Sequence, residues 1–391
     1  MNISILNGTG QVDYLYGLVS GLAVNPSNQI DVLDIDLRED LFGHFQNVNY
    51  YPVFKPQLRS DPFYFKIKNL ARYYSSQFWY IVSHKKRIVH FQWLDRHKII
   101  DRILLPLLAR LRGHKIVLTV HNINAGKRDN HDTWLNRFTL TIVYKLAHRL
   151  IVHTPQSKQE LMHEFNITDS KIVVIKHGMN NRVSQRGITN QEAKAHFGIH
   201  NDEKVLLFFG NIDYYKGLDI LIDSLFFLPE NISEKVRILI AGNSKSAEYT
   251  NQVLKKTEGN PLHNKISAHI KYIPDSEVEY YFKAADCIVL PYRAIYQSGV
   301  IFMAYTFGLP LIVTDVGNFK NDVIEGKTGF LVEPENPEKL SAVISGYFQS
   351  DLFKNLENTR ASIQDWAWKN YSWEAIGVET RALYESITHG E

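Results

Sequence analysis

Short, strongly apolar runs alternate with longer amphipathic stretches along nearly the whole chain. This alternation is typical of buried parallel strands joined by helices, because helices cover both faces of such a sheet. Six runs in each half of the chain predict two doubly wound α/β domains, not one very large sheet. The expected strands are residues 3–6, 30–35, 87–92, 115–122, 149–154 and 171–178, then 204–211, 236–243, 268–274, 287–292, 310–317 and 329–333.

The expected domains are residues 1–183 and 184–371. Residues 180–189 are polar and show no clear periodicity of apolar residues, which is typical of a linker. A capped-helix pattern follows them. A terminal helix at about residues 372–391 is expected to pack back on the first domain.

Composition narrows the class of protein. With 391 residues, 45% of them hydrophobic and 22% charged, the chain fits an ordinary globular protein. Its single cysteine, Cys287, rules out a disulfide framework and favours a reducing, cytoplasmic setting; we expect it to be a buried apolar residue. The chain enters a strand at once, so we expect no signal peptide, and no run reaches the roughly 20 apolar residues of a membrane span.

Charge is unevenly distributed along the chain. Residues 1–180 carry 23 Lys and Arg against 14 Asp and Glu, whereas the remainder carries 21 against 27. The first half should therefore prefer anionic partners, but no recognisable nucleic-acid module accompanies the charge. Residues 62–115 mix aromatic and basic side chains, which would suit docking at an anionic membrane. The alternative is a set of core aromatics beside a solvated basic face.

Three turns at strand ends could bind a ligand. The turn Gly8-Thr9-Gly10 allows close backbone approach, although it could be a tight turn and nothing more. Lys216 precedes a helix, where a cation is unfavourable unless an anion lies nearby; the alternative is a solvated surface lysine. Within residues 290–317, a Ser-Gly turn opens a helix between two buried strands, and free N–H groups there make an anion site. The expected occupant is a diphosphate.

His121 ends an expected strand, where an imidazole could exchange protons or hydrogen-bond with a substrate. His90, His153 and His177 also end strands and are weaker candidates. The sequence contains no metal-ligand motif, so we expect a metal-independent site in which Lys216 and backbone amides carry the phosphate charge.

Taken together, these pieces resemble glycosyltransferase family 4, the retaining nucleotide-sugar transferases of GT-B fold. The resemblance covers nearly the whole chain, and its specificity lies in the order and spacing of the motifs. In the first half these are the glycine turn and residues 118–122, 147–161 and 172–180; in the second they are residues 208–225, 238–243, 273–292, 297–317 and 323–340.

The resemblance implies two Rossmann-like domains facing across a cleft, with the acceptor held by the first and a nucleotide-sugar donor by the second. When the roles of the family's residues are assigned to the matching positions, Lys216 is implied to contact the donor diphosphate. Backbone N–H groups of Ser298, Gly299 and Val300 bind the same phosphates. His121 contacts the donor sugar, so His121 and Lys216 are the expected catalytic residues. The other implied positions are Gly210, Asn211, Gly242 and Gln297 for the donor, and Gly8, Thr9 and Gly10 for the acceptor or a phosphate.

Two departures from the family pattern stand out. Asn211 occupies the position of a phosphate-binding arginine, and Ile295 and Met303 occupy the positions of two glutamates. Ribose must then be held differently, and Gln297 or Ser298 could replace the first glutamate. A subgroup of the family with a Gln-Ser-Gly turn is similar to this chain, which indicates a variant site.

We therefore expect a retaining glycosyltransferase that moves a sugar from a nucleoside diphosphate to a glycan or lipid-linked glycan, in bacterial-type surface polysaccharide biosynthesis. The nucleotide sugar is a co-substrate, and no cofactor is expected. The expected location is cytoplasmic, with peripheral docking on the inner face of the cell membrane. The alternatives are a non-catalytic nucleotide-sugar-binding protein with a degenerate site and a GT-B type sugar-nucleotide epimerase.

Overall fold

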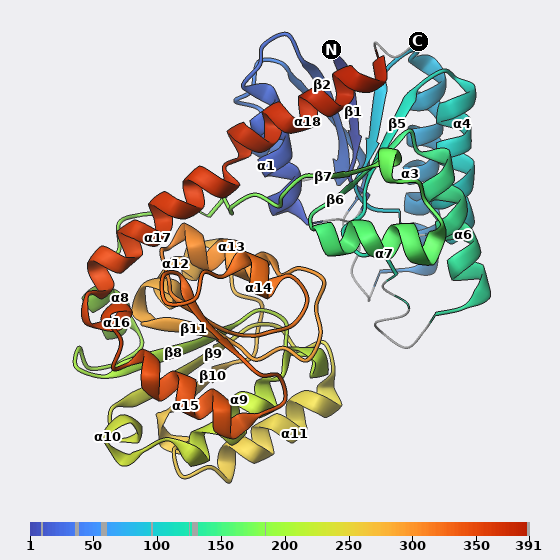
Figure 1. Cartoon of the computed structure of the whole chain (residues 1–391). Helices are drawn as coiled ribbons and strands as arrows, with labels where there is room; N and C mark the ends of the chain where they lie inside the picture. The colour runs from blue at the N-terminus through green and yellow to red at the C-terminus, as the bar shows by residue number, and fades with distance from the viewer. Residues whose placement is uncertain are drawn as a thin grey trace. The chain divides into compact units, whose positions relative to one another are not determined.

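A computed structural model describes residues 1–8, 11–35, 39–55, 61–94, 97–124, 126, 132–183 and 185–388. The chain forms two compact units, each built on a parallel sheet with helices (Figure 1). Unit 1 comprises residues 1–178 and 371–391, and unit 2 comprises residues 179–370. Each unit is a Rossmann-like doubly wound domain, as the sequence predicts.

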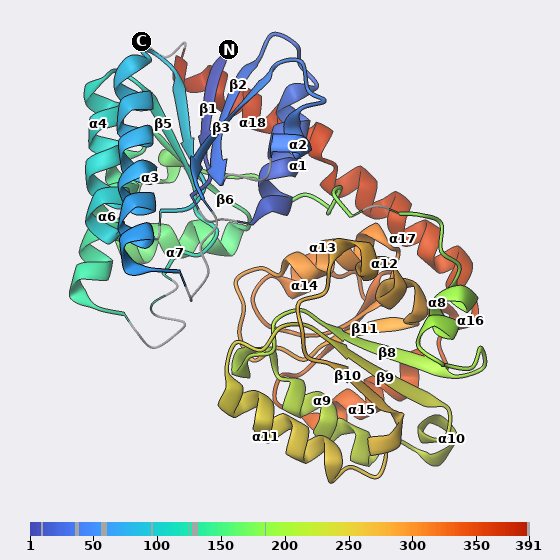
Figure 2. The ribbon, with the colours of Figure 1, turned by 180° about the vertical axis from the view of Figure 1, so that it is seen from behind.

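The sheet of unit 1 has seven parallel strands in the order β3-β2-β1-β4-β5-β6-β7. Figures 1 and 2 show α1 and α18 on one side of this sheet and α3, α4 and α6 on the other. The prediction of six strands is wrong by one, because β3 was missed. Its run carries Pro52, and its first five residues alternate between half-buried and exposed, as in an edge strand.

The elements of unit 1 are β1 (Asn2–Leu6), α1 (Val12–Ala23), β2 (Gln29–Ile35), α2 (Glu39–Phe42), β3 (Val48–Phe54), α3 (Phe63–Ser83), β4 (Ile88–Phe91), the π-helix η1 (Ile100–Leu104), α4 (Leu105–Leu111), β5 (Lys115–Thr119), α6 (Trp134–Leu146), β6 (Arg149–Val152), α7 (Pro155–Phe165), the 3-10 helix η2 (Asp169–Lys171), β7 (Ile172–Val174) and α18 (Trp373–Thr388).

The C-terminal helix α18 packs against α1 inside unit 1. Trp373 is buried at its start, and a Cβ added to Gly17 would lie 1.9 Å from the indole ring. Gly377 meets α1 equally closely, since its added Cβ would lie 2.3 Å from the carbonyl oxygen of Gly21. Small residues on both helices therefore let the two backbones approach, and α18 becomes part of the core of this unit.

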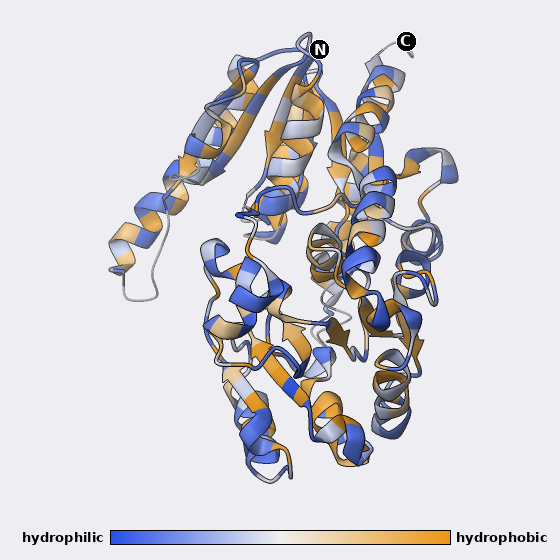
Figure 3. Cartoon of the chain, turned by 90° about the vertical axis from the view of Figure 1, so that its left-hand side faces the viewer, coloured by the Kyte–Doolittle hydropathy of each residue, from blue (hydrophilic) through white to orange (hydrophobic). Residues whose placement is uncertain are grey.

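The sheet of unit 2 has six parallel strands in the order β10-β9-β8-β11-β12-β13. Most residues of its strands are apolar, as the largely orange strands in Figure 3 show, because helices cover both faces. The expected strand at residues 268–274 lies earlier in the structure, at Ile266–His269. The expected capped helix is confirmed: Thr189 and Glu192 form a reciprocal capping box at the start of α8.

The elements of unit 2 are α8 (Asn190–His196), β8 (Lys204–Phe209), η3 (Tyr214–Lys216), α9 (Leu218–Ser224), η4 (Leu225–Phe227), α10 (Glu230–Ser233), β9 (Val236–Ala241), α11 (Ala247–Glu258), η5 (His263–Lys265), β10 (Ile266–His269), α12 (Asp275–Ala284), β11 (Cys287–Leu290), α13 (Gly299–Thr306), β12 (Leu311–Thr314), α14 (Phe319–Asp322), β13 (Gly329–Val332), α15 (Pro337–Tyr347), α16 (Asp351–Lys354) and α17 (Leu356–Tyr371).

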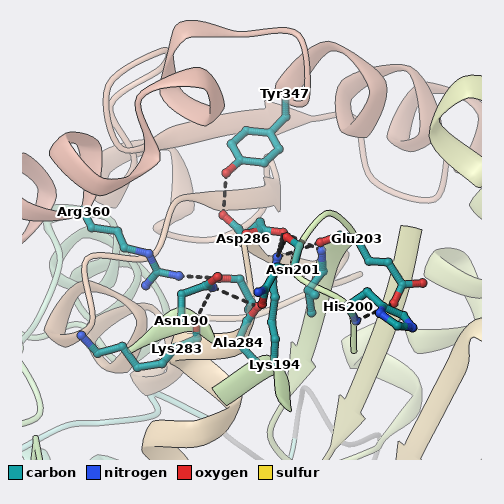
Figure 4. A network of polar contacts seen from close by, with 12 residues as sticks. Asn190, Lys194, His200, Asn201, Glu203, Lys283, Ala284, Asp286, Tyr347 and Arg360 are labelled. Carbon is teal, nitrogen blue, oxygen red and sulfur yellow. Dashed lines mark hydrogen bonds and ion pairs between the residues drawn. The ribbon is translucent and has the colours of Figure 1, made fainter. Parts of the chain in front are cut away.

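A buried polar network joins α8 to this sheet at the amino ends of β8 and β11 (Figure 4). Asp286 accepts a 2.7 Å hydrogen bond from the backbone N–H of Val205, and its carboxylate lies 3.4 Å from Lys194 Nζ. Lys194 also donates to the carbonyl oxygen of Glu203 at 2.7 Å. The charges of the Lys194 ammonium and the Asp286 carboxylate are thus both compensated by hydrogen bonds and by each other. Cys287, the next residue, is buried as expected.

No helix within the described ranges is both long enough and apolar enough to cross a membrane.

Candidate active site

The switch point of unit 2 lies between β8 and β11, where the strand order reverses and open α/β sheets bind ligands. Lys216 follows β8 in η3, and Tyr292 lies two residues after β11. Lys216 Nζ donates a 2.8 Å hydrogen bond to the Tyr292 hydroxyl and lies 4.7 Å from the centre of its ring. Two loops thus fix this ammonium at the switch point.

The charge of Lys216 is buried and has no carboxylate partner. Its relative exposure is 7%, and in the described parts of the chain no carboxylate lies within ion-pair distance. Burial alone would lower the pKa of Lys216, but the hydroxyls of Tyr292 and Tyr215 and the Asp213 charge together raise it above its ordinary value. A charged ammonium in this position is suited to an anion.

Gly210 lies beside the ammonium. A Cβ added there would be 3.2 Å from Lys216 Nζ and 3.3 Å from Val300 Cγ2, so Lys216, Gly210 and Val300 lie together. Gly242 packs on this turn, because its added Cβ would lie 1.8 Å from the carbonyl oxygen of Gly210. Asn211 is exposed.

The turn at Gln297–Val300 opens α13. Ser298 is buried at the N-cap but makes no side-chain cap, and the space beside Gly299 is open, with no atom within 4 Å of an added Cβ. Gln297 Oε1 is buried and has no hydrogen-bond partner in the described part of the chain. The first N–H groups of α13 and an unsatisfied amide oxygen therefore occur in one short segment.

The sequence did not single out Tyr292 and Arg293, which complete this part of the site. Arg293 forms a two-pronged ion pair with Asp219, at 2.6 and 2.9 Å, and lies over the ring of Tyr214. Its backbone N–H also donates to the carbonyl oxygen of Tyr215. Arg293 thus holds the loop that carries Lys216, and the signal for it was the Pro-Tyr-Arg turn at the end of an apolar strand.

The switch point of unit 1 lies between β1 and β4. Gly8 follows β1 with a positive φ of 63°, and an added Cβ would lie 2.8 Å from the carbonyl oxygen of Trp93, which follows β4. The predicted residues Thr9 and Gly10 lie outside the described residues. Trp93 was not predicted, although its position just beyond the 87–92 run could have indicated it.

His121 lies next to this turn and is held on both sides of its ring. Trp93 stacks on it, with ring centres 4.6 Å apart and planes 6° apart, and Tyr14 meets it edge-on at 4.6 Å. Gln92 Oε1 lies 3.2 Å from His121 Nε2, and His153 Nε2 lies 3.3 Å from His121 Nδ1. Gly8, Trp93 and His121 therefore form one cluster.

Four histidines at the carboxyl ends of neighbouring strands gather around Tyr14 and Thr119. Burial lowers the pKa of His90 and His153 to about 3 and that of His177 to about 4. Burial, together with repulsion from the other three, lowers the pKa of His121 well below its ordinary value. These imidazoles are therefore neutral near pH 7.

A cavity of about 80 Å³ lies beside His121. Its walls mix apolar residues with the polar groups of Gln92, Asn122, Asn136 and Arg102. Trp93, which also lines it, has a buried indole N–H with no partner among the residues that the structure describes. The cavity is thus suited to a ligand with both apolar and hydrogen-bonding surface.

Among the described residues, no three His, Cys, Asp or Glu side chains gather in a way that could hold a metal ion.

Comparison with known proteins adds to this picture. Residues 189–364 match the family model described as glycosyl transferases group 1. The uncharacterized glycosyltransferase MJ1607 of Methanocaldococcus jannaschii is 21% identical over 383 residues, which are 94% of this chain and 92% of that protein. The D-inositol 3-phosphate glycosyltransferase of Corynebacterium glutamicum is 24% identical over 297 residues, covering 73% of this chain and 70% of that one.

Solved structures share the fold. HepE of Anabaena, in complex with UDP, superposes with a TM-score of 0.74 at 15% identity, covering 99% of this chain and 100% of that chain. Sucrose-phosphate synthase of Thermosynechococcus elongatus gives a TM-score of 0.76 at 18% identity, with both chains covered completely. The fold is GT-B. Together with the family model, the named relatives make this protein an enzyme of the glycosyltransferase class.

Proposed function

We propose that this chain transfers a sugar from a nucleoside diphosphate to a hydroxyl group of a glycan or lipid-linked glycan, with retention at the anomeric carbon and without a metal ion. The assignment places it in the variant subgroup of glycosyltransferase family 4 that has a Gln-Ser-Gly turn. Its role would be in surface polysaccharide biosynthesis, in the cytoplasm.

The observation that carries the proposal is the buried ammonium of Lys216, which has a hydroxyl partner and no carboxylate partner among the described residues. Val300, in the first turn of α13, lies with this ammonium beside Gly210, since a Cβ added to Gly210 would be 3.3 Å from Val300 Cγ2 and 3.2 Å from Lys216 Nζ. A diphosphate would gain from both the ammonium and the free N–H groups of α13. The unpaired Gln297 Oε1 is suited to accept a hydrogen bond from a sugar hydroxyl.

In the proposed reaction, the bond between the anomeric carbon and the diphosphate oxygen breaks, and a bond to the acceptor oxygen forms on the same face. The acceptor proton passes to the departing diphosphate. Negative charge grows on the diphosphate as the bond breaks, so Lys216 and the N–H groups of Ser298–Val300 stabilise the transition state more than the ground state.

The neighbouring structures support a nucleotide-sugar donor, because HepE has been solved with UDP and with UDP-glucose. The acceptor would be bound by unit 1, where the cavity beside His121 and Trp93 offers apolar and polar surface. Gly8 would approach the acceptor or a phosphate, and Thr9 and Gly10 would act with it.

Product analysis tests the reaction against the alternatives. The protein is incubated with each nucleotide sugar alone and then with added glycan or lipid-linked glycan acceptors, and the products are examined by mass spectrometry and by NMR of the anomeric proton. The proposal predicts a glycosylated acceptor with the donor's anomeric configuration. A new nucleotide sugar formed without acceptor would indicate an epimerase, and binding without any product would indicate a non-catalytic protein.

We also propose that unit 1 docks on an anionic membrane through the surface formed by α3, α4 and α6. These helices lie side by side, because α3 contacts α4 and α4 contacts α6. Large apolar side chains on them are exposed, including Phe63 at 77%, Trp79 at 74%, Leu111 at 76% and Trp134 at 76%. Exposed basic side chains on or just beyond the same helices are Lys68, Lys85, Lys86, Arg110, Arg137 and Lys145.

The structure corrects part of the expected basic and aromatic surface. Tyr73, Tyr74 and Tyr80 are buried. Arg87 pairs with Asp31 at 2.7 Å, and Arg102 is buried and bonded to Asn136. The remaining surface still combines apolar anchors with positive charge, the combination that binds anionic headgroups.

Co-sedimentation with phosphatidylglycerol vesicles tests this docking. Binding should be strong at low salt, weaken at high salt, and be absent with phosphatidylcholine vesicles. Trp134→Ser should weaken it, whereas Tyr272→Ser, a change at a residue of unit 2 that is 70% exposed, should not. No binding to phosphatidylglycerol at low salt, or equal effects of the two changes, would contradict the docking.

A further inference from the structure

His153 fixes the protonation pattern of His121 by geometry. The carbonyl oxygen of Ile175 lies 2.9 Å from His153 Nδ1 and can only accept, so Nδ1 of His153 carries the proton. In neutral His153, Nε2 then has a lone pair, and the atom 3.3 Å away, Nδ1 of His121, must donate to it. Neutral His121 is therefore protonated at Nδ1 and has its own lone pair on Nε2.

Gln92 continues this series of hydrogen bonds on the other side of His121. Its amide oxygen lies 3.2 Å from His121 Nε2, and its amide nitrogen lies 3.0 Å from His90 Nε2. Two acceptors cannot bond, so a neutral His121 requires the opposite orientation of this amide, with NH₂ toward His121. The Gln92 oxygen then shares the His90 Nε2–H with the Thr119 hydroxyl oxygen, which lies 2.7 Å from the same nitrogen. His90 Nδ1, 2.6 Å from the Tyr384 hydroxyl, accepts from that group.

The two orientations of the Gln92 amide thus correspond to two states of His121. With NH₂ toward it, His121 is neutral and all hydrogen bonds run in one direction, from Tyr384 in α18 to the carbonyl of Ile175. With the oxygen toward it, His121 must carry protons on both nitrogens if it is also to keep its hydrogen bond to His153. Burial and the neighbouring His90, His153 and His177 disfavour the second state by lowering the pKa of His121. The neighbouring groups Tyr14 and Tyr384 are neutral hydroxyls, because burial raises the pKa of each.

We propose that His153 and Gln92 are positioning residues, which hold His121 in the Nδ1–H form so that Nε2 accepts a hydrogen bond from a hydroxyl of the sugar substrate. Stacking on Trp93 and the edge contact with Tyr14 fix the ring plane. Nε2 is then the ring atom that can change its hydrogen-bond partner. A substrate hydroxyl would replace the Gln92 amide at this atom. The role in catalysis rests on the proposed transferase function.

NMR of the ¹⁵N-histidine-labelled full chain without substrate tests the tautomer directly. His121 and His153 should both show the Nδ1–H pattern. His114 and His148 provide internal references with the opposite pattern, because the backbone N–H groups of Arg87 and Ile116 donate to their Nδ1 atoms. Finding His121 in the Nε2–H form, or as an even mixture, would overturn the proposal.

Variants separate positioning from simple structural support. His153→Leu should allow His121 to adopt either neutral tautomer. His153→Gln can still accept a hydrogen bond from His121 and should keep it in the Nδ1–H form. Gln92→Glu should give His121 protons on both nitrogens. His148→Gln is the matched control and should leave His121 unchanged; the His114 signal shows whether the fold is intact. An unaltered His121 signal in folded His153→Leu and Gln92→Glu would overturn the proposal.

Kinetics then link the tautomer to turnover. His153→Leu should lower kcat by tens of fold with little change in KM, because the donor is still bound but the reacting centre is misaligned. His153→Gln should restore most of kcat, and equal losses in both variants would contradict a positioning role. Absence of any transfer by the wild-type chain would refute the proposed function, whereas the tautomer measurement stands or fails independently of activity.

Discussion

Lys216 Nζ donates a 2.8 Å hydrogen bond to the hydroxyl of Tyr292, and both side chains are buried at the switch point of unit 2. Burying an ammonium costs free energy, and here the Tyr292 and Tyr215 hydroxyls and the Asp213 charge offset that cost enough to raise the pKa of Lys216. Lys194 differs: it is buried in the same unit but faces Asp286 and a backbone carbonyl. The same substitution should therefore have different effects on stability at the two lysines.

Lys216→Met should change the free energy of unfolding of the ligand-free protein by less than about 1 kcal/mol, because the side chain has no ion pair to lose and its hydroxyl neighbours only offset the cost of burying the charge. The same change should lower kcat by on the order of a hundredfold, since a preorganised charge contact is lost. Urea unfolding and steady-state kinetics measure the two effects.

Lys194→Met is the matched control for this pair of effects. It should lower the free energy of unfolding by about 3 kcal/mol, because it leaves Asp286 buried without its cation. Equal losses of stability in the two lysine variants would contradict this difference between Lys216 and Lys194.

Acid should destabilise unit 1 through its neutral histidines. His90 and His153 have a pKa of about 3 when folded, against 6.5 in the unfolded chain. The unfolded chain therefore binds more protons between these values, and the free energy of unfolding falls as pH decreases from 6.5 toward 3. Each histidine contributes about 1.4 kcal/mol per pH unit in this window.

Urea titrations at pH 7 and pH 5 measure this slope. His90→Gln should make it smaller, whereas His263→Gln, at an exposed position, should leave it unchanged. A slope in His90→Gln equal to that of the wild type would mean that His90 is not held neutral by the fold.

Trp373 should anchor α18 to unit 1. Its indole is 3% exposed and packs against Gly17 and Gly178. Trp373→Ala should lower the free energy of unfolding by about 3–5 kcal/mol, the usual cost of removing a buried aromatic side chain. Trp368→Ala removes an indole that is 54% exposed and should change stability by less than about 0.5 kcal/mol. Calorimetry of both variants would decide this, and similar losses would argue against the anchor.

Asn211→Arg should strengthen nucleoside diphosphate binding about tenfold, because it restores the cation that the family pattern has at this position. Titration calorimetry measures the affinity. Asn355→Arg adds the same charge at another exposed position of unit 2 and should have no effect. Equal gains in both variants would show a general effect of charge instead of a local contact.

Most strands and helices could be predicted from the sequence, because the spacing of apolar residues along a segment is a local property. Eleven of the twelve strand runs overlap their strands closely, and the capping box at Thr189 is a local motif. Strand β3 was missed because Pro52 and partly exposed tyrosines hide an edge strand. The strand β10 lies earlier than predicted because it is half-exposed and only four residues long.

The site was less predictable, because its contacts join segments far apart in sequence. Lys216 was recognised by its motif, but its partner Tyr292 lies 76 residues away. His121 was recognised as a strand-end histidine, but its stacking on Trp93 and its bond to His153 depend on the order of strands in the sheet. Such contacts follow from topology, which no single motif contains.

Thermal unfolding with a panel of nucleotide sugars tests the central claim most directly, because a ligand that binds the native state raises its stability. At a hundredfold excess over Kd the expected gain is about 2.7 kcal/mol, which is readily seen as a shift in Tm. We predict that at least one nucleoside diphosphate sugar raises the Tm of the wild type and that Lys216→Met loses most of this shift. If no nucleotide sugar raised the Tm, or if Lys216→Met kept the full shift, the assignment of Lys216 to a donor diphosphate would be contradicted.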